Sequence, residues 1–93
     1  MTQEKLLLTI DKYEKKFKEM EITPLEFPLN KLMEHHKFLT LGHCYAMLPD
    51  LRKFVEEGTQ KKLEKAFRWI GFIQGVLWSK GIFTIDEMRY DNM

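Results

Sequence analysis

The most constraining feature of this chain is the apolar stretch 66–78, which contains both tryptophans of the protein. Wound as a helix at about 100° per residue, it places four apolar residues in one stripe: Ala66, Ile70, Ile73 and Leu77. Trp69 and Val76 widen the apolar arc to roughly 200°, whereas a helix with one buried face needs only ~100°. We therefore expect cover on two sides, from the rest of a small bundle or from a second subunit.

Length and charge limit what the chain can be. Its 93 residues suffice for one domain, 1–93, with a modest core that oligomerisation would help to stabilise. The net charge of +1, with lysines and acids interleaved, offers no basic surface for nucleic acid. The single cysteine, Cys44, fits a reducing compartment, and no apolar run is long enough for a signal peptide or a membrane span. These features predict a cytoplasmic protein without nucleic-acid or membrane partners.

Apolar spacings of three and four predict three main helices, over residues 2–21, 30–57 and 59–80. Their predicted N-caps are Thr2, Asn30 and Thr59, and glycines 58 and 81 are predicted to end the second and third helices. The second helix contains Pro49, which with Gly42 falls on its outward side. Because the apolar register continues through the proline, we expect one kinked helix, with a break near Gly42 as the alternative.

The segment between the first two helices, residues 22–29, contains Pro24 and Pro28. Pro28 excludes a helix longer than one turn, so this segment should be a connector. Its apolar residues are expected to fold onto the bundle as a flap: Leu25, Phe27 and Leu29.

The C-terminal residues carry the clearest local signal. Thr84 and Glu87 have the spacing of a capping box, and Phe83 and Met88 have that of a hydrophobic staple. A short last helix should therefore run to about Asp91. Together these patterns predict an all-α fold: a small antiparallel bundle of three main helices, the second one long and kinked, with a short C-terminal helix folded onto it.

Three polar side chains are predicted to point inward. His36 and His43 are seven residues apart on one apolar helix face, and Gln74 lies within the apolar arc of the third helix. Buried polar groups need hydrogen-bond partners. In the structural interpretation they bond each other, Thr40 or a backbone carbonyl, and so specify helix register. In the functional interpretation the three line a pocket for a small polar ligand or anion, with Arg68 at its rim.

The same residues do not predict a metal centre or an active site. His36 and His43 lie about two turns, ~10 Å, apart along the helix, whereas helical metal ligands need i,i+3 or i,i+4 spacing. The sequence has no phosphate-binding glycine loop, no Cys-x-x-Cys and no Ser/His/Asp arrangement that spacing supports. We therefore predict a non-catalytic protein without metal or cofactor, and an enzyme is the least favoured of three hypotheses.

Two glycines and several aromatic residues predict a protein interface. Gly71 and Gly75 share one helix face, and each costs about 1 kcal/mol of helix stability relative to alanine. A gain elsewhere is expected: close approach of another helix, or room for a bulky neighbour such as Trp78. Outward aromatic residues beside such a helix favour an interface. Its predicted members are Trp69, Gly71, Phe72, Gly75 and Val76 of the third helix, with Phe38 and Tyr45 of the second.

Residues 65–78, followed by residues 84–88 and Asn92, resemble small uncharacterised accessory proteins of tailed bacteriophages. Those proteins share a histidine-containing helix, a glycine turn and an Arg-Trp-x-Gly-Phe-x-Gln-Gly segment. The resemblance covers roughly the C-terminal half and transfers no activity and no functional residue. It implies an accessory protein acting in an infected bacterial cytoplasm, where such proteins often bind a host factor or sequester a signalling nucleotide.

Two functional hypotheses follow from these observations. The first is a non-catalytic interaction protein, a homodimer or higher homo-oligomer through the third helix, that binds and modulates a host factor. The alternative is a protein that binds or sequesters a small ligand, such as a signalling nucleotide, through His36, His43, Arg68 and Gln74.

Overall fold

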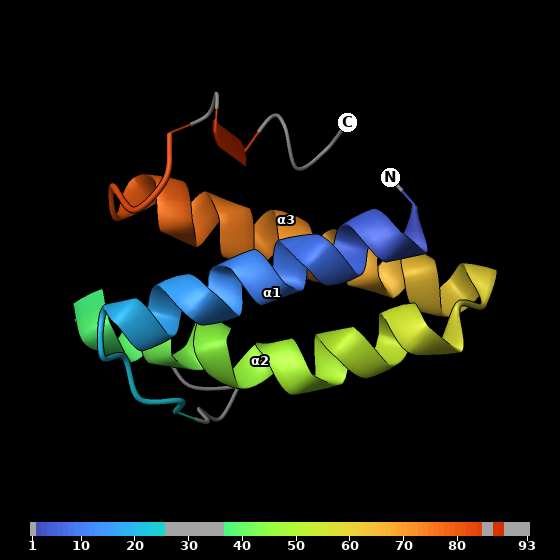
Figure 1. Ribbon diagram of the computed structural model, residues 1–93, viewed down its shortest axis with the longest axis horizontal. Coiled ribbons are helices and arrows are strands. Elements are labelled where there is room, and N and C mark those ends of the chain that lie inside the picture. Colours follow the sequence, from blue (N-terminus) through green and yellow to red (C-terminus); the bar gives the residue numbers. More distant parts are fainter. Residues whose placement is uncertain (1, 26–36, 85–86, 89–93) are drawn as a thin grey trace.

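The structure is a computed structural model that describes residues 2–25, 37–84 and 87–88, with the backbone alone for 37–39 (Figure 1). Three helices make up most of this part of the chain: α1 (Gln3–Glu19), α2 (Lys37–Glu57) and α3 (Gln60–Ser79). The described residues contain no strand, so the predicted all-α class and its three main helices are confirmed. The helices lie side by side, and α2 packs against both α1 and α3.

The helix starts follow from single capping residues. The Thr2 Oγ1 atom accepts a hydrogen bond from the backbone N–H of Lys5 at 3.1 Å, and Thr59 Oγ1 accepts one from Lys62 at 3.2 Å. Each bond satisfies a backbone donor that has no partner inside its own helix. The two predicted caps at Thr2 and Thr59 are confirmed, whereas Asn30 lies outside the described residues.

The helix ends use the left-handed backbone conformation. After α3, Gly81 has φ +71°, and the N–H of Ile82 donates to the carbonyl of Leu77 at 2.9 Å. After α1 the same arrangement is made without glycine, because Glu21 takes φ 58° and the Ile22 N–H donates to Phe17 at 3.0 Å. Both are Schellman-type ends, which satisfy the last carbonyls of a helix.

Helix α2 continues through both Gly42 and Pro49, as the prediction of one helix requires. Pro49 is exposed on its outward side. The outward placement of Gly42 is wrong, because this residue is buried beneath the connector. The Leu25 N–H donates to the Gly42 carbonyl at 3.0 Å, and a Cβ atom at Gly42 would lie 2.7 Å from the Thr23 carbonyl oxygen. The expected flap is thus present at Leu25, whereas Phe27 and Leu29 lie outside the described residues.

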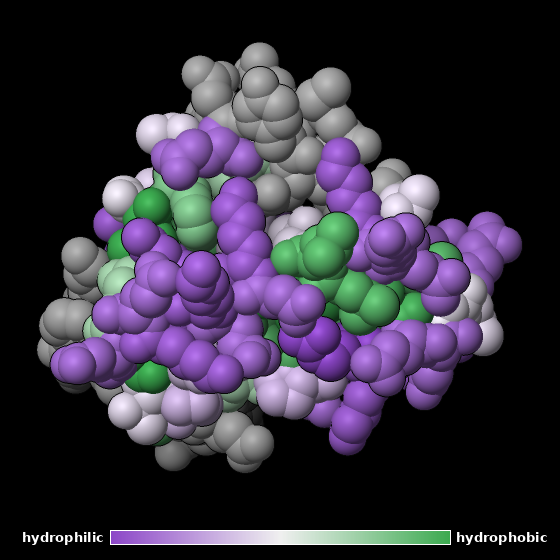
Figure 2. Space-filling view, viewed as in Figure 1, coloured by the Kyte–Doolittle hydropathy of each residue, from purple (hydrophilic) through white to green (hydrophobic). Residues whose placement is uncertain are grey.

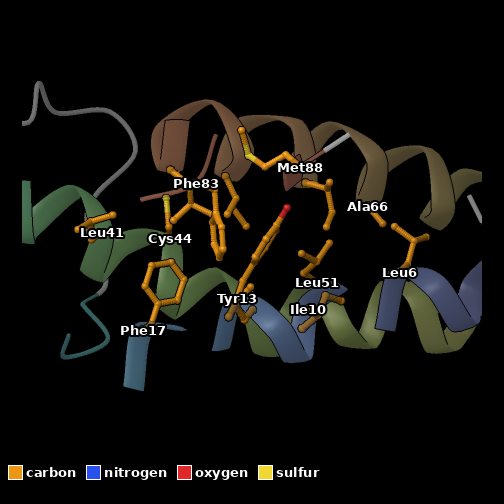
Figure 3. Close-up of a cluster of buried hydrophobic side chains, with 14 of the residues drawn as sticks. Leu6, Ile10, Tyr13, Phe17, Leu41, Cys44, Leu51, Ala66, Phe83 and Met88 are labelled. Carbon is orange, nitrogen blue, oxygen red and sulfur yellow. The ribbon is translucent and has the colours of Figure 1, made fainter. Parts of the chain in front are cut away.

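The core lies between the three helices, and the predicted stripe of α3 faces it (Figure 3). Each large apolar side chain that leaves water contributes about 1.5–3 kcal/mol. The fully buried side chains are Leu6, Ile10, Tyr13 and Phe17 from α1, Leu41, Cys44, Leu48, Leu51 and Val55 from α2, and Ala66, Ile73 and Leu77 from α3.

The chain after α3 adds two residues to this core, Phe83 and Met88, which are 8% and 7% exposed. The predicted capping box is formed: the Thr84 N–H donates to Glu87 Oε1, and the Glu87 N–H donates to Thr84 Oγ1, both at 3.1 Å. These hydrogen bonds lower the pKa of Glu87. Residues 87–88 are helical, and the remainder of the predicted short helix lies outside the described residues.

Side chains at the surface join α1 to α2. Arg52 pairs with Asp11 at 2.7 Å and lies 3.6 Å from a Glu14 oxygen, and Glu14 also pairs with Lys18 of its own helix at 3.0 Å. Exposed pairs of this kind contribute about 0–1 kcal/mol each, so the apolar core dominates the energetics.

We predict opposite effects of alanine at two glycines. Gly42→Ala should lower the free energy of unfolding by about 1–3 kcal/mol, because its Cβ meets a backbone oxygen that cannot move cheaply. Gly71→Ala, the matched control, should raise it by roughly 0.5–1 kcal/mol, because its Cβ meets nothing within 4 Å and alanine favours the helix. Urea unfolding followed by circular dichroism measures both changes. Changes of equal sign would contradict the close packing of the connector against Gly42.

Candidate protein interface on α3

The side of α3 that points away from the core carries exposed aromatic side chains, and the exposed polar residues Glu64, Arg68 and Ser79 lie between them. Three aromatic side chains are exposed there, Phe67 at 42%, Phe72 at 50% and Trp78 at 54%, and Gly71 and Gly75 are exposed between them. At about 100° per residue, Phe67 and Trp78 form one edge of this surface, Phe72 forms the other edge, and the glycines lie between. We call these five residues the outer face of α3. A Cβ atom added at either glycine would meet nothing within 4 Å, so the helix surface at both glycines is open.

Other surfaces of the molecule differ from this one. Figure 2 shows the side on which α1 lies in front, and hydrophilic side chains cover most of it around a limited hydrophobic patch. Among the described residues, four large hydrophobic side chains are exposed, and three of them belong to the outer face of α3; the fourth is Leu8 of α1. Scattered exposed apolar residues are ordinary, whereas several on one helix face mark a candidate binding surface.

The structure divides the predicted interface residues into two groups. Gly71, Phe72 and Gly75 are exposed, as an interface requires. Others already pack within the chain: Trp69 meets Phe54 edge to face with ring centroids 4.9 Å apart, and Val76 packs against the core.

Tyr45 was placed outward on its helix, but its ring stacks on Phe17 with centroids 5.2 Å apart. The side chain of Phe38 lies outside the described part of the chain. The predicted interface does not include Phe67 and Trp78, yet both are exposed. The apolar arc alone could not reveal this, because it does not show which of its edges a neighbouring helix covers. Their angular distance of about 100–120° from Ala66 was the available signal.

The inward polar residue of α3 has a partner that the sequence did not indicate. Gln74 Nε2 donates a hydrogen bond to the Tyr13 hydroxyl oxygen at 3.0 Å. The Tyr13 side chain is fully buried, and Figure 3 shows its oxygen pointing from α1 toward α3. A buried hydroxyl without a partner costs about 1–3 kcal/mol, so this bond removes a penalty from both side chains. It connects α1 to α3, which otherwise meet mainly through α2.

The other predicted ligand-binding residues do not lie around Gln74. His43 faces the opposite edge of α3, where its ring meets Phe72 edge to face with centroids 6.4 Å apart. Its Nδ1 atom is buried and has no hydrogen-bond partner among the described residues. Arg68 is exposed, and His36 lies outside the described part of the chain. The structure therefore does not bring His43 and Gln74 into one pocket.

The chemistry at Cys44 is that of a core residue. Its side chain is fully buried, and burial raises the pKa of the thiol to about 12. Since the thiolate is the reactive form, this cysteine is a poor nucleophile at neutral pH.

Within the described residues, no group of three or more His, Cys, Asp or Glu side chains could hold a metal ion. Of the helices that the structure describes, none has the length and hydropathy needed to cross a membrane.

Comparison with known proteins finds no matching family model, no matching curated protein and no matching solved structure. The resemblance to bacteriophage accessory proteins therefore stays a prediction, and function has to be argued from the surface of the molecule itself.

We predict that Tyr13 and Gln74 are energetically coupled. In a double-mutant cycle of Tyr13→Phe and Gln74→Leu, the double variant should be more stable than the sum of the single effects by about 0.5–1.5 kcal/mol, because each single substitution already removes the hydrogen bond that the two side chains share. The matched control combines Gln74→Leu with Tyr45→Phe, whose ring stacks on Phe17 instead. The effects of these two substitutions on the free energy of urea unfolding should add to within ~0.5 kcal/mol. Equal coupling energies in both cycles would contradict the assignment of the coupling to the hydrogen bond between Tyr13 and Gln74.

Proposed function

We propose that this chain is a non-catalytic interaction protein that binds another protein molecule through the outer face of α3. One observation carries the proposal: α3 buries one face in the core and leaves Phe67, Phe72 and Trp78 together on the opposite face. Aromatic side chains are enriched in protein interfaces, where they remove a large apolar area from water.

The two glycines support the same proposal. Gly71 and Gly75 each cost about 1 kcal/mol of helix stability relative to alanine, and the described part of the chain places nothing against them. Because glycine has no side chain, the helix backbone is accessible at these two positions between the aromatic edges. This suits the close approach of a second helix. Room for a neighbour of the same chain, the other explanation of the pair, has no support in these contacts.

The alternative function, binding of a small ligand such as a signalling nucleotide, has weaker support. It needs His43, Arg68 and Gln74 to face one ligand. Gln74 instead bonds Tyr13 on the α1 side, and His43 meets Phe72 on the other side. The buried Nδ1 atom of His43 is the one feature in its favour.

The wider context belongs to the proposal as well. From the bacteriophage resemblance we propose an accessory protein that acts in the cytoplasm of a bacterial host and modulates a host factor. For the fold we propose the finer features of the sequence prediction: an antiparallel order of the helices, a kink at Pro49 in α2 and a short helix that starts at Thr84.

The proposed interface can be tested with a photo-cross-linking amino acid placed at single positions of the chain in bacterial cells. Placed at Phe67, on the outer face of α3, it should give covalent adducts with protein, either a second copy or another protein. Placed at Lys15, an exposed position on α1, it should give few. Denaturing gel electrophoresis and mass spectrometry of the adducts measure the difference.

The same experiment can contradict the proposal. Equal adduct yields at Phe67 and Lys15, or none at either, would show that α3 has no special contact with protein. Circular dichroism of each purified variant serves as the folding control, since both positions are exposed and tolerate a large side chain.

A further inference from the structure

We propose that the occupant of the outer face of α3 is a second copy of this chain, paired antiparallel about a two-fold axis that passes between Gly71 and Gly75. The inference rests on the proposed function, because it names the partner of that same face. The match between the aromatic residues of the face supports this pairing, its charges select the antiparallel order, and its area sets the expected strength of the dimer.

The aromatic residues match each other under this symmetry. In an antiparallel pair centred at position 73, residues equally distant from the centre lie at the same level, and each edge of one helix meets the same edge of the other. Phe67 then lies within about one residue of the level of Trp78 in the second copy. Phe72 meets its own counterpart at the other edge, while the glycines cross at the centre. Both exposed edges are thus covered at once.

The charges select the antiparallel order. Glu64 and Arg68 are exposed on α3 within this face, at nearly the same angles around the helix as the two glycines. A parallel two-fold pair would place each of them level with its own copy, and like charges at contact distance are destabilising. The antiparallel pair separates the two Arg68 side chains by about 15 Å and the two Glu64 side chains by about 27 Å along the axis.

The available area predicts a weak dimer. With about half of each of the three aromatic side chains exposed, and ~200 Å² per side chain, the apolar patch measures roughly 300 Å². A standard interface buries about 800 Å² per partner, so the contact must extend along the length of α3 and still belong to the small class. We therefore expect a dissociation constant on the order of tens of micromolar, with the free chain a folded monomer.

Sedimentation equilibrium of the full chain tests this inference. Between roughly 5 µM and roughly 500 µM, the weight-average mass should rise from near 11.2 kDa toward twice that value. Gly75→Leu should weaken association at least ~10-fold, because its side chain blocks the close approach of the second helix, and the monomer should stay folded because that position is open. Lys15→Leu adds the same side chain on α1 and should leave the dissociation constant unchanged within about twofold.

The orientation has its own test, made in the same solution. Chains carrying Arg68→Cys should form disulfides with chains carrying Ser79→Cys, because these positions share one edge and nearly one level in the antiparallel pair. Each variant alone should form few, and the buried Cys44 does not interfere. Efficient disulfides within each variant alone would overturn the antiparallel order.

Failure of this inference can be distinguished from failure of the proposed function. A chain that stays monomeric throughout the concentration range, but forms adducts with a different protein from Phe67, overturns the second-copy assignment and leaves the interface standing. A monomer that gives no adducts overturns both. A dimer that Gly75→Leu and Lys15→Leu weaken equally places self-association elsewhere on the molecule and also overturns the inference.

Discussion

The burial of the apolar stripe of α3, Ala66, Ile70, Ile73 and Leu77, sets the rotation of this helix about its own axis. The hydrogen bond from Gln74 to the fully buried Tyr13 fits the same rotation, because Gln74 lies at the edge of the stripe that faces α1. The side of the helix opposite the stripe, with Phe67 and Trp78 at one edge and Phe72 at the other, therefore faces outward.

The glycines of this small helical fold have different structural roles. At Gly42 the missing side chain lets the connector cross α2 closely enough for a backbone hydrogen bond with Leu25. At Gly81 the residue supplies the left-handed backbone that ends α3. At Gly71 and Gly75 neither reason applies, since both are helical and open. The contact outside the single chain that we propose would supply a physical reason for them.

Much of the fold could be predicted from the sequence because its determinants are local. The caps at Thr2 and Thr59, the capping box of Thr84 with Glu87 and the buried stripe of α3 each depend on residues within a few positions of one another. The burial of Gly42 and the stacking of Tyr45 could not be predicted in this way. They depend on where the connector and α1 lie in space, which periodicity within one helix does not contain.

In the candidate site, too, features that depend on nearby residues could be predicted, whereas features that depend on distant parts of the chain could not. The placement of Gly71, Gly75 and Phe72 on one side of the helix could be predicted, because their spacing is visible in the sequence. The exposure of Phe67 and Trp78 could not, since it depends on α1 and α2 covering only one side of α3. The partner of Gln74 was also missed, because 61 residues separate it from Tyr13 in the chain.

The most direct measurement is acrylamide quenching of Trp78 fluorescence in a Trp69→Phe variant, followed as a function of protein concentration. Trp69 packs against Phe54, so its conservative replacement leaves the indole of Trp78 as the sole reporter of the outer face. Trp78 should be readily quenched in dilute solution and become protected as the chain associates. Protection of Trp78 in the dilute monomer would contradict the account, because the face would then be covered by the chain itself.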